Sequence, residues 1–218
     1  MILDCSYRLP GPLACKVLSE DGHEVVRLEH LTKKDPFSTS RLPGVATWYK
    51  KFNEKKQTYT FDLIQLEHFL EKNSAKIDAA IVDQPSPFIP TLKKFNIRLL
   101  TICSSRLSRR PLHDLDLLAA NGYFEESESE IPNLPFVGIL FAQRIITEFY
   151  KLLLYKKNEV TVFLDETKEL INTVNLPPEH RFFAGKVMGY NQYQLKDGRL
   201  FLTALESKSW DKFLSFIE

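Results

Sequence analysis

Three residues near the N-terminus, Pro10, Gly11 and Pro12, suit the binding of an anion. They follow an apolar strand expected at residues 2–5 and open a helix expected at residues 12–20. Pro12 fits the first helical turn because its missing N–H costs nothing there, and Gly11 permits a close backbone approach. The positive end of the helix then faces whatever binds above the sheet edge. The site is not a dinucleotide fingerprint, because the other glycines of G-x-G-x-x-G are absent.

A run of lysines supplies a second group of cations, in the segment "KKFNEKK" at residues 50–56. Lysine ammonium groups are suitable point charges for phosphates. The same pattern is also typical of an ordinary solvated surface, and both interpretations stay open. Over the whole chain, 29 Lys and Arg nearly balance 28 Asp and Glu, so no nucleic-acid partner is expected.

Strands and helices alternate over the first hundred residues, as they do in a parallel sheet with crossover helices. The predicted strands are 2–5, 24–29, 58–62, 77–82 and 97–103, and the predicted helices between them are 12–20, 64–73 and 88–95. Further along we expect a short helix at 113–122, a long one at 137–156, a hairpin at 190–205 and a last helix at 209–217. The chain therefore reads as α/β, with a Rossmann-like large domain at 1–156 and a small α+β part with a C-terminal hairpin at 157–218.

The three cysteines are interpreted as buried thiols in a reducing compartment, because Cys5, Cys15 and Cys103 lie in apolar patterns without metal-ligand spacing. No metal is therefore expected. The N-terminus lacks the basic and apolar regions of a secretory signal. The most apolar stretch, residues 136–155, is interrupted by charged side chains, which favours a core helix over a membrane span. We expect a cytoplasmic protein without a membrane partner.

Several segments, in this order, resemble one protein family. They are "ILDCSYRLPGPLACKVLSEDGHEVVRLEH", "WYKKFNEKKQTYTFDL", "HDLDLLAANGYF", a helix from Gly138, and "YNQYQLKDGRLFLTALESKSWDKFLSFIE". Together they are similar to the family III CoA-transferases, which include formyl-CoA transferase and α-methylacyl-CoA racemase. The resemblance implies a Rossmann-like large domain, a smaller inserted domain and two interlinked subunits. It also implies a coenzyme A thioester bound near the domain interface.

The resemblance also implies site residues. In the racemases of this family a His and an Asp exchange the proton α to the thioester carbonyl, and a Glu supports the His. The His falls on His113 and the Glu on Glu206. A neutral imidazole held in one tautomer by a carboxylate suits such proton transfer. Yet His113 also fits the capping of a helix start, and Glu206 fits a solvated acid.

The family's catalytic Asp is replaced here by Asn133, and no carboxylate occurs from Ile131 to Thr147. In the transferases this Asp is the nucleophile, and an Asn can neither replace it nor take up a proton as a base. CoA transfer is therefore disfavoured, and the racemase mechanism loses one of its two bases.

Two main hypotheses follow. The first is an acyl-CoA-binding protein of racemase-like type, with His113 as base and Glu206 orienting it. Its expected CoA contacts are Pro10, Gly11, Pro12, Arg27, Asn53, Lys55 and Lys56. The alternative is a non-catalytic scaffold or protein-interaction module of the same fold. An NAD-dependent enzyme is disfavoured by the missing glycine fingerprint. A homodimer, possibly interlocked, is expected to cover surface that the family's longer chains bury.

Overall fold

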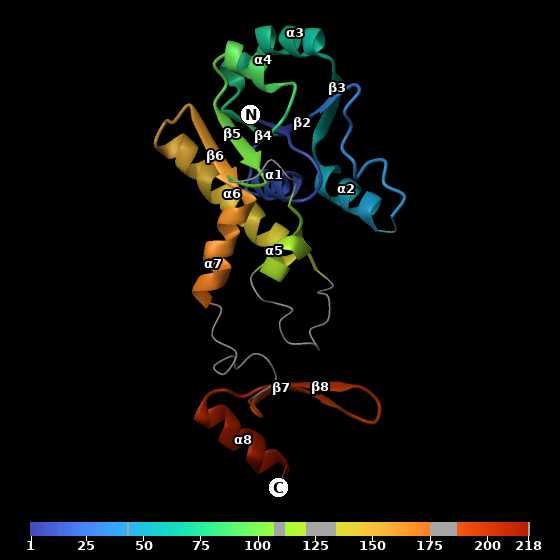
Figure 1. The fold of residues 1–218 in the computed structure, drawn as a ribbon, viewed down its shortest axis with the longest axis vertical. Coiled ribbons are helices and arrows are strands. Elements are labelled where there is room, and N and C mark those ends of the chain that lie inside the picture. The colour runs from blue at the N-terminus through green and yellow to red at the C-terminus, as the bar shows by residue number, and fades with distance from the viewer. Residues whose placement is uncertain (43, 107–111, 121–133, 175–186, 218) are drawn as a thin grey trace. The chain divides into compact units, whose positions relative to one another are not determined.

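The computed structural model describes residues 1–42, 44–106, 112–120, 134–174 and 187–217 (Figure 1). The chain divides into two compact units, Met1–Leu170 and Ile171–Glu218.

The first unit is built on a six-stranded parallel sheet. Its strands are β1 (Ile2–Cys5), β2 (Val25–His30), β3 (Gln57–Phe61), β4 (Ala79–Asp83), β5 (Leu99–Cys103) and β6 (Glu159–Phe163). They lie in the order β3-β2-β1-β4-β5-β6, which is the doubly wound order of Rossmann-type folds. The predicted α/β class is therefore confirmed.

Helices cover both faces of this sheet, as the parallel crossovers require. The helices are α1 (Pro10–Glu20), α2 (Val45–Asn53), α3 (Leu63–Asn73), α4 (Ile89–Lys94), α5 (Asp114–Ala120), α6 (Phe136–Leu154) and α7 (Thr167–Val174), with short 3-10 turns at Ser74–Lys76 and Leu164–Glu166. One core joins Ile2 to α1 and α6, and the other joins the next residue, Leu3, to α3 and α4. Alternate side chains of β1 thus enter different cores, because successive Cβ atoms point to opposite faces.

Three elements were not predicted: α2 and β6 of the first unit, and α7, which begins in the first unit and ends in the second. Strand β6 pairs with β5 from Leu99↔Glu159 to Cys103↔Phe163, so the sheet continues past the predicted domain boundary at residue 156. The first unit accordingly extends to Leu170.

The second unit contains an antiparallel hairpin and a helix. Strand β7 (Tyr190–Gln194) pairs with β8 (Arg199–Thr203), with Tyr190 opposite Thr203, and α8 (Ser207–Ile217) follows. The hairpin and the last helix are thereby confirmed. None of the described helices, in either unit, has the length and apolar character needed to cross a membrane.

Gly11 allows α1 to approach the sheet closely. A Cβ on Gly11 would overlap the Ser6 side chain and lie 2.9 Å from Cδ1 of Ile102. We expect Gly11→Ala to lower the free energy of unfolding by about 1–3 kcal/mol in urea denaturation. Gly22→Ala is the control. The φ of Gly22 is +95°, but a Cβ placed there would have no neighbouring part of the chain within 4 Å. This variant should therefore lose only about 1 kcal/mol of unfolding free energy, the cost of a left-handed backbone. Equal losses would contradict the close approach.

Candidate functional site

A cavity of about 520 Å³ opens at the carboxyl-terminal ends of β1, β4 and β5. Its wall includes residues 7–10 after β1, residues 83–85 at the end of β4, and residues 112–114 at the start of α5. β1 and β4 are the neighbouring strands at which the sheet order reverses. Ligands of open α/β sheets bind at this kind of switch point, so the cavity is the candidate site.

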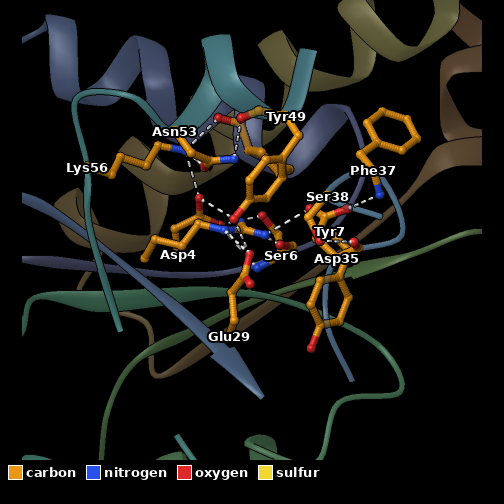
Figure 2. A network of polar contacts seen from close by, with 12 residues as sticks. Asp4, Ser6, Tyr7, Glu29, Asp35, Phe37, Ser38, Tyr49, Asn53 and Lys56 are labelled. Atoms are coloured by element: carbon orange, nitrogen blue, oxygen red, sulfur yellow. Dashed lines mark hydrogen bonds and ion pairs between the residues drawn. The ribbon is translucent and has the colours of Figure 1, made fainter. Parts of the chain in front are cut away.

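Next to the cavity residues lies a buried ionic network centred on Arg27. Figure 2 labels its carboxylate partners Asp4, Glu29 and Asp35. Its guanidinium, fully buried, donates to Asp4 at 3.1 Å, to Glu29 at 3.1 Å and to Asp35 at 2.8 Å. It also donates to the backbone carbonyl of Ser6 at 2.7 Å. The sequence analysis predicted that Arg27 contacts a CoA phosphate. In the structure, its guanidinium instead forms ion pairs with the buried carboxylates.

Lys56 belongs to the same network. Its ammonium donates to Asp4 at 2.8 Å, to the carbonyl of Pro12 at 2.9 Å and to the side-chain oxygen of Asn53 at 3.0 Å (Figure 2). The Asn53 amide in turn donates to the carbonyl of Tyr49 at 2.8 Å. Lys56 and Asn53, which the sequence also assigned to CoA, therefore tie the end of α2 to β1 and α1. The neighbouring Lys55 is exposed and faces solvent.

The network determines the charge of its carboxyl groups. Burial alone would raise the pKa of Asp4, but the charges of Lys56 and Arg27 hold that pKa well below its usual value. Asp4 is thus ionised under all ordinary conditions, and its charge is matched internally.

Removing the central cation leaves buried carboxylates without a counter-charge. We expect Arg27→Met, which keeps most of the volume, to lower the free energy of unfolding by about 3–5 kcal/mol. Lys93→Met is the matched control, because Lys93 forms an ion pair with Glu159 at 2.8 Å on the surface, with half of each side chain exposed. Exposed pairs contribute little, so its loss in urea denaturation should be far smaller. Similar losses would mean that the Arg27 network does not carry the first unit's stability.

Asp83, the last residue of β4, places a different kind of carboxyl group in the cavity wall. It accepts the backbone N–H of Tyr7, and within the described ranges it forms no ion pair. Burial raises the pKa of Asp83 to about 7, with the nearby Asp4 and Asp35 charges adding to the rise. A carboxyl group with such a pKa can both donate and accept a proton near neutral pH.

This raised pKa predicts a pH-dependent stability. Because the folded protein binds the Asp83 proton more tightly than the unfolded chain, its stabilising contribution falls as pH rises from about 4 to about 7. Asp83→Asn keeps an acceptor for Tyr7 and removes the titration. We expect the variant to gain stability relative to the native protein as pH rises from about 4 to about 7, by up to about 4 kcal/mol in urea denaturation. A difference that does not change with pH would contradict the shift.

His113 lies at the start of α5 and contributes to the cavity wall. It is exposed; its backbone N–H donates to Asp116 at 2.7 Å, and its carbonyl accepts the N–H of Leu117 at 3.3 Å. The residue therefore both begins the helix and presents a side chain at the cavity. Next to it, Asp114 accepts the N–H of Gly138 at 2.7 Å, which joins α5 to α6, and burial raises the pKa of Asp114.

The Pro10-Gly11-Pro12 turn begins α1, as predicted. Pro10 contributes to the cavity wall, while Gly11 and Pro12 are buried. Since proline has no N–H, Gly11 is the single backbone donor among the three residues. The helix dipole points toward the cavity region, but an anion there has only one of these N–H groups to bind.

The structure does not bring all the predicted residues together. Glu206 is exposed in the second unit, where its carbonyl accepts the N–H groups of Ser209 and Trp210 at 2.9 Å, and its support of His113 stays a prediction. Asn133 lies outside the described residues. Conversely, Arg8 and Asp83 line the cavity and were missed. An acid at the end of an apolar strand, followed by a proline-rich turn, was the available signal for Asp83.

Within the described ranges, no group of three or more His, Cys, Asp or Glu side chains is placed to hold a metal ion.

Comparison with known proteins identifies the fold. No protein-family model and no curated protein matches the sequence. Among solved structures, a crystal structure of the hypothetical protein Rv3272 from Mycobacterium tuberculosis matches with a TM-score of 0.72 and 18% identity, over 99% of this chain and 67% of that one. Its orthorhombic form matches with a TM-score of 0.70 and 18% identity, over 99% of this chain and 65% of that one. A CAIB/BAIF family protein from Brucella suis matches with a TM-score of 0.71 and 13% identity, over 99% and 68%.

The chain thus spans about two thirds of the length of these solved structures. At such low identity the likeness concerns the fold alone, and that fold is the one expected from the resemblance to family III CoA-transferases.

Proposed function

We propose that the chain binds a coenzyme A thioester in the cavity at the carboxyl-terminal edge of its sheet. The observation that carries this proposal is the position of His113, which lines the same cavity as the start of α1. The sequence resemblance and the CAIB/BAIF-like fold support the choice of an acyl-CoA over other ligands of α/β sheets.

In this proposal the acyl group and thioester occupy the cavity beside His113, and the phosphates lie at its edge, where Pro10 begins α1. The exposed Lys55 and the N-terminus of α1 are the phosphate contacts that remain from the sequence-based set. Arg27 and Lys56 serve the ligand only indirectly, by fixing the loops around it.

The proposed chemistry is proton exchange at the carbon α to the thioester carbonyl. A neutral His113 imidazole takes the α-proton, and the electron pair of the broken C–H bond moves into the enolate. A protonated carboxyl group then returns a proton to the same carbon. With Asn133 unsuited to this role, Asp83 is the group in the cavity with a matching pKa, which burial raises to about 7.

A second candidate function is binding without turnover. The Asn at position 133 favours it, because the family's own proton carrier is missing from the sequence. Assembly into a homodimer stays a prediction under either candidate.

Two measurements separate these functions. First, CoA and a 2-methylacyl-CoA should raise the thermal midpoint, because a ligand that binds only the folded state stabilises that state. At a ligand concentration a hundredfold above Kd, the stabilisation is about 2.7 kcal/mol. Second, deuterium from D2O should enter the α position of the bound ester. His113→Asn keeps a good helix cap but removes the base, so it should abolish exchange and leave the CoA shift in place.

The outcomes are distinct. A midpoint shift without exchange in the native protein supports binding without turnover. Exchange that survives in the His113→Asn variant means that His113 is not the base. No shift with CoA or any acyl-CoA refutes the proposed function itself.

A further inference from the structure

Two segments that border the cavity carry exposed cations. The first joins β2 to α2 and contributes Pro36 and Phe37 to the cavity wall, and the second is α2 itself, which contributes Trp48. The rings of Phe37 and Trp48 lie 6.2 Å apart, so the two segments meet beside the cavity. Their exposed cations, which we call the basic border, are Lys33, Lys34, Arg41, Lys50 and Lys51.

The basic border has little counter-charge of its own. None of its side chains takes part in an ion pair within the part of the chain that the structure describes. Asp35, in the first segment, is buried and paired with Arg27. Among the described residues from 31 to 54, Glu54 is the one exposed acid. The border is therefore positive, although the whole chain is nearly neutral, with 29 Lys and Arg against 28 Asp and Glu.

Exposed apolar side chains lie in the same segments as these cations. Leu31 is 52% exposed and Leu42 is 67% exposed. Surfaces that bind proteins combine apolar contacts with charges complementary to those of the partner. Nucleic acids, in contrast, are held without sequence preference mainly by cations at their phosphates. The mixture of leucines and cations therefore favours an acidic protein as the partner.

We propose that an acidic carrier protein docks on the basic border and inserts a thioester, held on a phosphopantetheine arm, into the cavity. This inference rests on the proposed function, which places a thioester beside His113. The arm of a carrier ends in the same pantetheine thioester as CoA, and its phosphate fits the edge where Pro10 begins α1. Positive charge beside the cavity steers an acidic partner toward its entrance.

The nucleotide of CoA is the other source of negative charge for the basic border. Its phosphates could use some of these cations, but the nucleotide gives no reason for the exposed Leu31 and Leu42. The two ligands share the pantetheine thioester and differ in what is attached beyond the arm. A comparison of a loaded carrier with an acyl-CoA therefore separates them.

The test measures the binding of butyryl-loaded acyl carrier protein and of butyryl-CoA by calorimetric titration. Combining Lys33→Glu with Lys34→Glu should weaken binding of the loaded carrier about tenfold to a hundredfold, because like charges then face each other. The affinity of this variant for butyryl-CoA should change by less than about twofold, as expected for exposed charges that the ligand does not contact. The matched control combines Lys72→Glu with Lys76→Glu, two exposed lysines outside both segments, and should bind both ligands as the native protein does.

Two further measurements keep the test independent of one variant. Combining Lys50→Glu with Lys51→Glu changes the other segment and should cause a similar loss for the loaded carrier. A carrier without its phosphopantetheine arm should bind the native protein more weakly than the loaded one, because only the arm reaches the cavity. Equal binding of the two carriers would overturn the inference.

The remaining outcomes separate the inference from the proposed function. If butyryl-CoA binds and the loaded carrier does not, the inference fails and the proposed function stands. If the loaded carrier alone binds, CoA is refuted as the ligand and the inference is supported. If neither binds, both fail. Equal losses of both ligands in the charge-reversed variants would assign the basic border to the phosphates of CoA. Duplex DNA or anionic lipid vesicles that bind as tightly as the loaded carrier would also overturn the inference.

Discussion

A single buried guanidinium imposes most of the order around the cavity. Arg27 on β2 contacts a carboxylate on β1, another on its own strand and a third, Asp35, in the segment that follows β2. A charge removed from water is tolerated only when nearly every donor finds an acceptor, so these contacts must form together. The contacts of Arg27 therefore fix β1, β2 and the segment around Asp35 relative to one another.

The same network determines which charges the cavity presents. Arg27 and Lys56 are turned inward, so the cations that looked most available in the sequence are neutralised. Asp35, which is held by Arg27, accepts the backbone N–H of Arg8. This contact fixes the Arg8 backbone, and the residue lies in the cavity wall. The network thus decides where positive charge remains in the cavity wall.

The cavity combines groups that suit acid–base work with a fold that does not by itself specify a reaction. His113 and Asp114 lie together at the start of α5, whereas Asp83 ends β4. The backbone N–H of His113 donates to Asp116, and the carboxylates of Asp83 and Asp114 accept backbone N–H groups. Burial raises the pKa values of Asp83 and Asp114, whereas an unpaired surface carboxylate keeps its ordinary pKa. In the proposed chemistry, the second proton carrier therefore does not depend on the residue at position 133.

The sequence by itself determined the alternation of strands and helices, the hairpin and the close turn at Gly11, because each leaves a local pattern within a few residues. It missed α2, β6 and α7, each of which has nine residues or fewer. It predicted His113 as a base and Pro10 as a CoA contact, and both line the cavity. It also predicted CoA contacts for Arg27, Asn53 and Lys56, which form internal hydrogen bonds instead. Only the tertiary structure decided their role, since their partners lie far away along the chain, as Asp4 does from Lys56 at a separation of 52 residues. Burial and charge pairing depend on such distant contacts, and these also placed Arg8 and Asp83 in the cavity wall.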